Sequence, residues 1–308
     1  MTMTALPLEA LVEQFGDRLL ANVPLARLTS ARIGGPADWL LEAASADELA
    51  EIVTRLWALD VPFTMLGGGS NILISDRGVR GVVVHNRAHA VTWHTENEPP
   101  SVWAESGANF GALARQAAQK SLSGLEWAAG IPGTVGGAVY GNAGAHGGDI
   151  AANLRLAEVL HRHTGRQKWK LEDLRYSYRS SVLKEGLGQA VVLSATLNLS
   201  HGDPAAIEKK MDEYLAHRRR TQPPGASMGS MFKNPPGDYA GRLIEAAGLK
   251  GLRVGEVQIS DLHGNFFVNL GEGTAAQALE LIQQAQAQVE SQTGVRLELE
   301  VELVGEWQ

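Results

Sequence analysis

Apolar side chains recur at helical spacing in several stretches of the chain, and each stretch predicts a helix. The clearest begins after Ser45, an N-cap residue with Glu48 at the capping-box position, and continues with apolar residues from Leu49 to Leu59. Similar patterns predict helices over residues 8–20, 110–120, 207–220, 239–247 and 275–291. The charged helix over 207–220 is followed by Thr221-Gln-Pro-Pro-Gly, which is typical of a helix end.

Between these helices, short runs of β-branched and alternating residues predict strands. The runs are Asp38–Glu42, Val61–Leu66, Ile72–Ile74, Gly81–His85, Val91–His94, Ser101–Glu105, Leu154–His161, Ala190–Leu199, Phe266–Asn269 and Leu297–Val304. In the last run the glutamates alternate with apolar residues, which predicts one polar and one apolar face. The last third of the chain reads as a mixture of helix and strand. The change of character at Gly202-Asp-Pro places the main domain boundary near residue 200.

Composition excludes several classes of function. The chain has 308 residues, enough for two or three domains with a sizeable core. Its 34 acidic and 27 basic residues give a net charge of −7, which disfavours broad nucleic-acid binding. The absence of cysteine excludes disulfides, iron–sulfur clusters, thiolate zinc sites and cysteine nucleophiles. Because the first 20 residues lack a signal-peptide pattern and no long apolar run occurs, we expect a cytoplasmic protein without membrane insertion.

Glycine is the unusual feature: the chain has 35 glycines, about 11% of its residues, whereas the average is near 7%. Two tracts concentrate it. The first, Gly67-Gly-Gly-Ser-Asn71, follows a predicted strand, and the second runs from Gly130 to Gly148. Backbone N–H groups approach a phosphate closely where side chains are absent, so the tracts predict anion cradles. Neither tract has the P-loop or the dinucleotide-fold pattern, and structural turns are the alternative. Two tracts together favour a large ligand that carries phosphates.

Longer motifs around these tracts resemble one family, the UDP-N-acetylenolpyruvoylglucosamine reductases (UDP-N-acetylmuramate dehydrogenases). The likeness begins in the first tract and in the segment Trp127–Gly144, and it extends in the family's order over nearly the whole chain. The further motifs are Thr29–Pro36, Tyr178–Ser181, Gly229–Pro235, Gly248–Leu252, Ile259–Phe266 and Leu297–Val301. The segment Val182–Gln189 is too short for the loop with a substrate-binding tyrosine found in one class, so the chain is similar to the shorter class.

The resemblance implies a fold and a cofactor. The expected fold is α+β, with a two-lobed FAD-binding region of the vanillyl-alcohol-oxidase type over 1–200 (lobes of about 1–72 and 73–200) and a substrate-binding domain over 201–308. FAD is expected to bind without a covalent bond. The residues expected to hold it are Gly67, Gly68, Gly69, Ser70, Asn71, Ile72, Gly130, Ile131, Pro132, Gly133, Thr134, Gly136, Gly137, Ala138, Asn142, Gly144 and Arg218. Arg218 otherwise reads as a solvated arginine at a helix end.

The reaction that the resemblance implies is reduction of UDP-N-acetylglucosamine enolpyruvate to UDP-N-acetylmuramate, with NADPH as hydride donor. The resemblance implies that Arg179 contacts the enolpyruvyl carboxylate, a task that suits a planar guanidinium. Ser230 is expected to protonate the carbon beside the carboxylate. Glu300 is expected in the active site, where a protonated carboxyl group fits a developing enediolate. Without the family motifs these three residues read as a surface charge, a turn residue and part of a solvated strand face.

Three further residues are expected to bind substrate by the same resemblance: Tyr178, Lys233 and Asn234. His146 stands where the family often has tyrosine. His161 and His163 alternate on a predicted strand without a nearby acidic partner, so we expect no metal site. Two other classes of protein stay open: a flavin oxidase of the same fold, and an inactive nucleotide-sugar binding protein. The expected partners are small molecules only, and the expected oligomeric state is a monomer.

Overall fold

The structure is a computed structural model that describes residues 6–186 and 189–307. The chain divides into two compact units that interleave along the sequence. Unit 1 comprises Met1–Leu20, Leu40–Gly68 and Gly81–Ala216, and unit 2 comprises Ala21–Trp39, Gly69–Arg80 and His217–Gln308. The predicted domain limits, 1–200 and 201–308, stay predictions drawn from the sequence.

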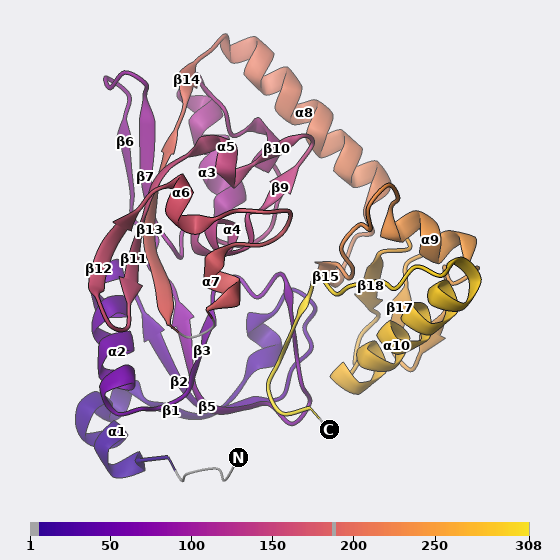
Figure 1. Cartoon of the computed structure of the whole chain (residues 1–308), viewed down its shortest axis with the longest axis horizontal. Helices are drawn as coiled ribbons and strands as arrows, with labels where there is room; N and C mark the ends of the chain where they lie inside the picture. Colours follow the sequence, from indigo (N-terminus) through magenta and orange to yellow (C-terminus); the bar gives the residue numbers. More distant parts are fainter. Residues whose placement is uncertain (1–5, 187–188, 308) are drawn as a thin grey trace. The chain divides into compact units, whose positions relative to one another are not determined.

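Unit 1 is built on an antiparallel five-stranded sheet with the order β12-β11-β13-β7-β6, which Figure 1 shows with helices beside it. Its strands are β6 (Val91–His94), β7 (Ser101–Glu105), β11 (Leu154–His161), β12 (Gly165–Trp169) and β13 (Ala190–Asn198). Helices α2 (Ala46–Ala58) and α4 (Val135–Gly141) pack against this sheet, and α3 (Phe110–Gln119) shares its core. Because α4 begins within the second glycine tract, its buried residues join this tract to the core of unit 1.

Shorter elements complete the chain path of unit 1. They are α1 (Leu8–Phe15), η1 (Gly16–Arg18), β3 (Phe63–Leu66), β8 (Leu122–Ser123), η3 (Glu126–Ala128), β9 (Gly144–Ala145), β10 (Gly148–Asp149), α5 (Ile150–Asn153), α6 (Leu171–Leu174), α7 (Val182–Glu185) and β14 (Ser200–His201). A second sheet has the order β1-β2-β5-β3, in which β3 pairs parallel to β5. Elements β1 (Leu20–Pro24), β2 (Pro36–Ala43), β5 (Val79–Asn86) and α8 (Pro204–Thr221) run across the sequence limits of the units.

Unit 2 is an antiparallel sheet covered by two helices. The strand order is β15-β18-β17-β16, and α10 packs on β16, β17 and α9 (Figure 1). The elements are η2 (Leu25–Leu28), β4 (Ile72–Ile74), β15 (Ala226–Ser230), α9 (Ala240–Ala246), β16 (Arg253–Val254), β17 (Val257–Ile259), β18 (Phe266–Asn269), α10 (Ala275–Thr293) and β19 (Glu302–Val304). Ala31, Ile33 and Leu73 join the buried core of this unit, so segments early in the sequence are integral to it.

Most of the predicted elements are confirmed, and two are corrected. The helix predicted over 8–20 ends at Phe15, because Gly16 takes φ +50° and stops it, and Leu20 already begins β1. The strand predicted over 297–304 is reduced to β19 at Glu302–Val304, with one isolated bridge at Leu299. Leu297 and Val301 are buried in the core and Leu299 packs against it, as the alternation predicted, but Leu303, in the β19–β4 pair, is exposed.

Candidate active site

The two glycine tracts meet in unit 1. A Cβ atom at Gly67 would lie 2.8 Å from Thr134 Oγ1, and one at Gly68 would lie 3.1 Å from Gly133 Cα. Both distances are shorter than ordinary contacts, so only glycine lets the first tract approach the second this closely. Gly130 and Gly133 have φ of +75° and +110°, a backbone region that side chains disfavour. We call this meeting of the two tracts the cradle; that it holds a phosphate-bearing ligand stays a prediction.

The second tract continues into α4, a helix with three glycines among its seven residues. Thr134 caps it by accepting the N–H of Gly137 at 3.3 Å, and the N–H of Gly136 donates to Ser106 O at 2.7 Å. The N–H of Val135 donates to Ala108 O at 2.9 Å. The first turn of α4 is therefore already bonded to the protein. Donors to a phosphate in this cradle are expected from the loops that precede the helix.

Several other predicted cofactor residues have structural partners of their own. Asn142 takes the left-handed conformation at the C-cap of α4, accepts the N–H of Ala151 at 3.2 Å and donates to Ser177 O at 3.2 Å. A Cβ at Gly144 would lie 2.9 Å from Gly148 O, across the β9–β10 pair. His146 stacks on Tyr214 with ring centroids 4.2 Å apart. A contact of Asn142 or Gly144 with FAD stays a prediction.

Arg179 lies in unit 1 at the tip of a two-residue turn. Ser177 and Ser180 bond each other through both backbone N–H groups, at 3.1 and 3.2 Å, and Tyr178 and Arg179 lie between them. Arg179 has φ +56°, a conformation that costs a residue other than glycine of order 1–3 kcal/mol. Its guanidinium carbon lies 5.7 Å from the centre of the exposed Tyr178 ring. Arg175, four residues earlier, has the same kind of conformation, with φ +46°.

Ser230 and Glu300 are brought together by backbone pairing in unit 2. Ser230 ends β15, after a register shift against β18 and after Gly229, which has φ +77°. The next residue, Met231, accepts the N–H of Glu300 at 2.9 Å, and Phe232 forms a bridge with Leu299. Two segments that are distant in the sequence thus place the serine and the glutamate on neighbouring backbones.

The end of the first glycine tract completes this arrangement in unit 2. Asn71 donates from Nδ2 to Glu300 O at 3.1 Å and accepts the N–H of Glu302 at 3.0 Å. Ile72 then pairs with Glu302 in the parallel β4–β19 pair. The Cβ position of Gly229 lies 3.7 Å from Ser70 O. Predicted flavin and catalytic residues therefore share one local framework around Glu300.

Asn265 was missed by the sequence analysis as a contributor to this framework. Its side-chain amide accepts the N–H of Phe232 at 2.9 Å through Oδ1 and donates from Nδ2 to Phe232 O at 2.8 Å. Its main-chain carbonyl accepts the N–H of Met231 at 2.8 Å. The side chain is 3% exposed, so these bonds are made away from water. The signal available in the sequence was an asparagine just before the apolar run Phe266–Val268.

Lys233 and Asn234, expected to bind the substrate, and Arg218, expected to bind FAD, have different surroundings. Lys233 forms an ion pair of 3.5 Å with Glu298, and its N–H donates to Glu298 O. Asn234 accepts the N–H of Ala240 at 3.1 Å and so caps the start of α9. Arg218 is half-buried near the end of α8, and burial lowers the pKa of its guanidinium, whereas Arg219 and Arg220 are exposed. This difference singles out Arg218 among the three arginines.

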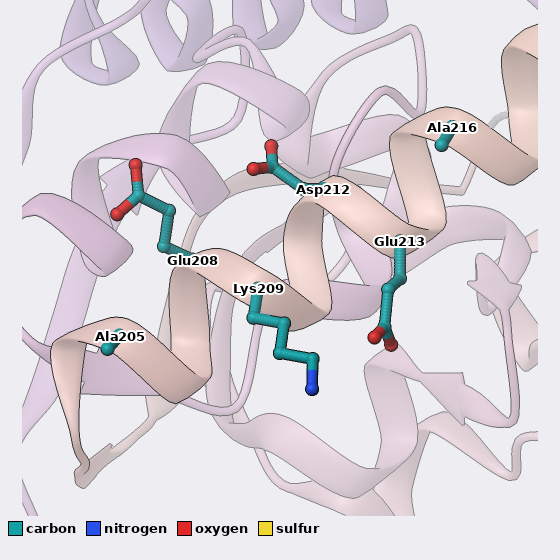
Figure 2. A pocket seen from close by; sticks show the side chains of 6 residues that line it. All are labelled: Ala205, Glu208, Lys209, Asp212, Glu213 and Ala216. Atoms are coloured by element: carbon teal, nitrogen blue, oxygen red, sulfur yellow. The ribbon is translucent and has the colours of Figure 1, made fainter.

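A surface groove of about 550 Å³ lies elsewhere, along α8 in unit 1. It is lined by one helix alone, through Ala205, Glu208, Lys209, Asp212, Glu213 and Ala216. Figure 2 shows that the charged side chains point away from the helix in different directions. None of the predicted site residues lines this groove. Among residues 6–186 and 189–307, no group of three or more His, Asp or Glu side chains has the geometry of a metal site.

Comparisons with known proteins match separate parts of the chain to a flavin-binding domain and to a reductase domain. A family model described as the C-terminal domain of UDP-N-acetylenolpyruvoylglucosamine reductase matches residues 221–304, and an FAD binding domain model matches residues 37–169. The reductase of Chloroflexus aggregans is 43% identical over 291 residues, which cover 93% of this chain and 97% of that protein. The chain belongs to the UDP-N-acetylenolpyruvoylglucosamine reductase family.

Other members of this reductase family also match over more than nine-tenths of their length. The protein of Rubrobacter xylanophilus is 46% identical, over 92% of this chain and 94% of its own. The crystal structure of the family member from Thermus caldophilus has a TM-score of 0.79 and 37% identity, covering 93% of this chain and 99% of that one. The family and the flavin-binding region predicted from the motifs are therefore confirmed. Within the described part of the chain, no helix is long and apolar enough to cross a bilayer.

Proposed function

We propose that this protein is an FAD-dependent reductase that converts UDP-N-acetylglucosamine enolpyruvate to UDP-N-acetylmuramate, a step of peptidoglycan precursor synthesis, with NADPH as hydride donor. The proposal is supported by membership of the reductase family over more than nine-tenths of the chain. The structural observation that carries it is the meeting of the two glycine tracts at Gly67 and Thr134. We further propose that the protein acts as a monomer in the cytoplasm.

The cradle in unit 1 fits FAD by its chemistry. A dinucleotide presents a pyrophosphate to main-chain N–H groups. The cradle carries no side chain at Gly67, Gly68 and Gly133, because the Thr134 side chain fills the Cβ position of Gly67, backbone fills that of Gly68, and Gly133 has φ +110°. The chain has no cysteine to attach a flavin covalently, which supports non-covalent binding. The chemistry that FAD supplies when bound is relay of a hydride from NADPH to the terminal vinyl carbon of the substrate.

Arg179 is proposed to bind the carboxylate of the enolpyruvyl group. Hydride addition at the terminal carbon moves negative charge onto the adjacent carbon and its carboxylate. A guanidinium stabilises this charge as it develops and holds the carboxylate through two parallel bonds. Because Arg179 is fixed at the tip of a tight turn, its donors are preorganised, and preorganised charge lowers the barrier. Tyr178, exposed beside it, is proposed to contact the substrate.

Ser230 and Glu300 are proposed to handle the proton. Ser230 holds the hydroxyl proton that moves to the carbon beside the carboxylate, and Glu300 supports the enediolate-like charge through a protonated carboxyl group. Serine is a weak acid, but a carbanion-like carbon is a strong base, so the transfer is chemically reasonable. The backbone hydrogen bond between Met231 and Glu300 keeps Ser230 and Glu300 in register. Lys233, Asn234 and Arg218 are proposed to contact the UDP portion or the cofactor.

The test is purification of the full chain followed by assay with the named substrates. We expect a yellow protein whose flavin is released to the supernatant by acid, and which oxidises NADPH over many turnovers only when the enolpyruvyl substrate is present. Rapid reoxidation by oxygen with an alcohol as electron donor would instead identify a flavin oxidase. Tight binding of the nucleotide sugar without turnover would identify an inactive binding protein.

A further inference from the structure

The turn that carries Arg179 is held from outside by side chains of its neighbours. Tyr176 Oη donates to Val139 O at 2.8 Å, and Ser181 Oγ donates to Tyr140 O at 2.6 Å. From the other side, Asn142 Nδ2 donates to Ser177 O at 3.2 Å. All three bonds join the turn to one place, the C-terminal end of α4.

The acceptors on α4 are the carbonyl groups that a helix cannot satisfy itself. The last four carbonyl groups of a helix have no partner within it, and Val139 and Tyr140 belong to the last turn of α4. Tyr176 and Ser181 therefore satisfy the helix end while they hold both ends of the turn. Ser181 is fully buried and occupies the N-cap position of α7, yet its hydroxyl makes no capping bond there. Its hydrogen bond serves α4 instead.

The opposite end of α4 lies in the flavin cradle. Thr134 and Gly136 fix that end against Gly67 and Ser106. A helix of seven residues is about 10 Å long, at 1.5 Å per residue. Because both ends are bonded within unit 1, α4 is a rigid spacer of fixed length between the cradle and the Arg179 turn.

We propose that Tyr176 and Ser181 are positioning residues for the known family reaction, which act by fixing the Arg179 turn on α4. This inference rests on the proposed function, in which Arg179 holds the enolpyruvyl carboxylate. Arg179 and Arg175 both have positive φ, +56° and +46°, so the segment has a strained backbone that relaxes when its bonds are lost. A relaxed turn moves the guanidinium away from the carboxylate without removing any group that touches FAD.

The experiment compares Tyr176→Phe and Ser181→Ala with wild type in single-turnover measurements on FAD-loaded enzyme. We expect NADPH oxidation in the absence of substrate at the wild-type rate, and reduction of the enolpyruvyl substrate slowed by about 10-fold, the scale of one misplaced electrostatic contact. Each substitution is also made in the Arg179→Lys background. There we expect a further loss of less than about 2-fold, because residues that act through one group are not additive.

Ser45→Ala is the matched control, since it removes one hydroxyl hydrogen bond from unit 1 at the N-cap of α2. We expect it to lower the melting temperature while both half-reactions stay at the wild-type rate. The proposal is overturned if Tyr176→Phe and Ser181→Ala slow both half-reactions equally, lose FAD, or act additively with Arg179→Lys. If Arg179→Lys itself leaves substrate reduction unchanged, the proposed role of Arg179 fails instead. Ser181→Ala decides the question alone if Tyr176→Phe does not fold.

Discussion

The proposed catalytic residues differ in how their backbones are held. Arg179 has a strained φ and depends on hydrogen bonds from side chains around it. Ser230 follows a glycine with positive φ, and Glu300 is fixed by a direct backbone bond to Met231 and by Asn71. A side chain whose backbone is fixed loses little further entropy when it meets a substrate. At this scale the chemistry of each residue can be tested separately.

Arg179→Lys keeps the positive charge but loses the planar fork that binds a carboxylate through two bonds. We expect the NADPH half-reaction to be nearly unchanged and substrate reduction to fall by about 10–1000-fold, equivalent to ~1.4–4 kcal/mol. Stopped-flow absorbance of the flavin measures both half-reactions. A larger effect on the NADPH half-reaction would contradict the assignment to the carboxylate.

Ser230→Ala removes the proposed proton donor and leaves no buried charge, so FAD content and stability are expected to stay close to wild type. Hydride delivery is expected to be spared more than completion of turnover, and the product is expected to lose its single configuration at the new centre. The measurement is rapid mixing of the reduced variant with substrate in heavy water, followed by stereochemical analysis of the product. Ser227→Ala, on the same strand, is the control. Turnover at the wild-type rate with one configuration would indicate another donor, with Glu300 next.

At the scale of elements, α4 shows why a glycine-rich segment folds as a helix. Glycine is the poorest helix former after proline, so sequence propensity gave no prediction of this helix. Tertiary contact decides instead: a Cβ at Gly136 would lie 2.8 Å from Ser106 Cβ, whereas one at Gly141 would meet nothing within 4 Å. Only the first position therefore needs glycine for space.

Gly136→Ala is expected to push α4 away from Ser106, to destabilise the protein by about 1–3 kcal/mol and to weaken FAD binding. Gly141→Ala lies in the same helix and is expected to be neutral or to stabilise by up to about 1 kcal/mol, because alanine favours a helix. Thermal unfolding and titration of the apoprotein with FAD measure both effects. Equal behaviour of the two variants would show that close packing on Ser106 is not the reason for glycine at position 136.

How much the sequence predicts follows from which signals are local. The N-cap at Ser45, the strand Ser101–Glu105 and the helix predicted over 275–291 rest on local patterns, and all three are confirmed. The capping box is not: the Glu48 carboxylate accepts the N–H of Ala44 instead of that of Ser45. The alternation over Leu297–Val304 misled, because only Glu302–Val304 pairs with a strand, β4, whereas the backbone before it bonds to Met231 and Lys233. The sequence predicted that both glycine tracts bind one large ligand, but it did not predict that the tracts touch each other. The contact of Gly67 with Thr134 depends on tertiary structure.

At the scale of the whole molecule, no local signal in the sequence shows that unit 2 includes Ala21–Trp39 and Gly69–Arg80. Composition changes near residue 200, where the charged helix α8 begins, while the compact units change at His217 inside that helix. The early segments contribute single apolar residues such as Ile33 and Leu73 to a core formed mostly by the last third of the chain. Contributions this sparse leave no periodic pattern.

The unfolding free energy is expected to depend on pH through Glu126, which is buried in unit 1. Burial alone would raise the pKa of Glu126, but hydrogen bonds from Ser123 Oγ and the Gly124 N–H outweigh it and hold the pKa below the ordinary value of 4.5. A depressed folded-state pKa stabilises the protein above pH 4.5, and this stabilisation is lost as the pH falls through the folded-state value.

Glu126→Gln removes the charge and leaves the shape. We expect the variant to be less stable than wild type at pH 7, and the difference to shrink as the pH falls below about 4.5. Urea unfolding at several pH values measures this difference. A difference that is constant over the whole range would show that the charge of Glu126 contributes nothing.

The parallel pairing of β4 with β19 has a consequence for synthesis on the ribosome. Strand β4 leaves the exit tunnel early, but its partner, Glu302–Val304, follows every other element of the described chain. Unit 1 is complete in sequence at Ala216, whereas the edge of β4 waits for β19 throughout the remaining translation. An unpaired edge is a template for pairing with another chain, so nascent chains are most exposed to aggregation, and most in need of a chaperone, during this interval.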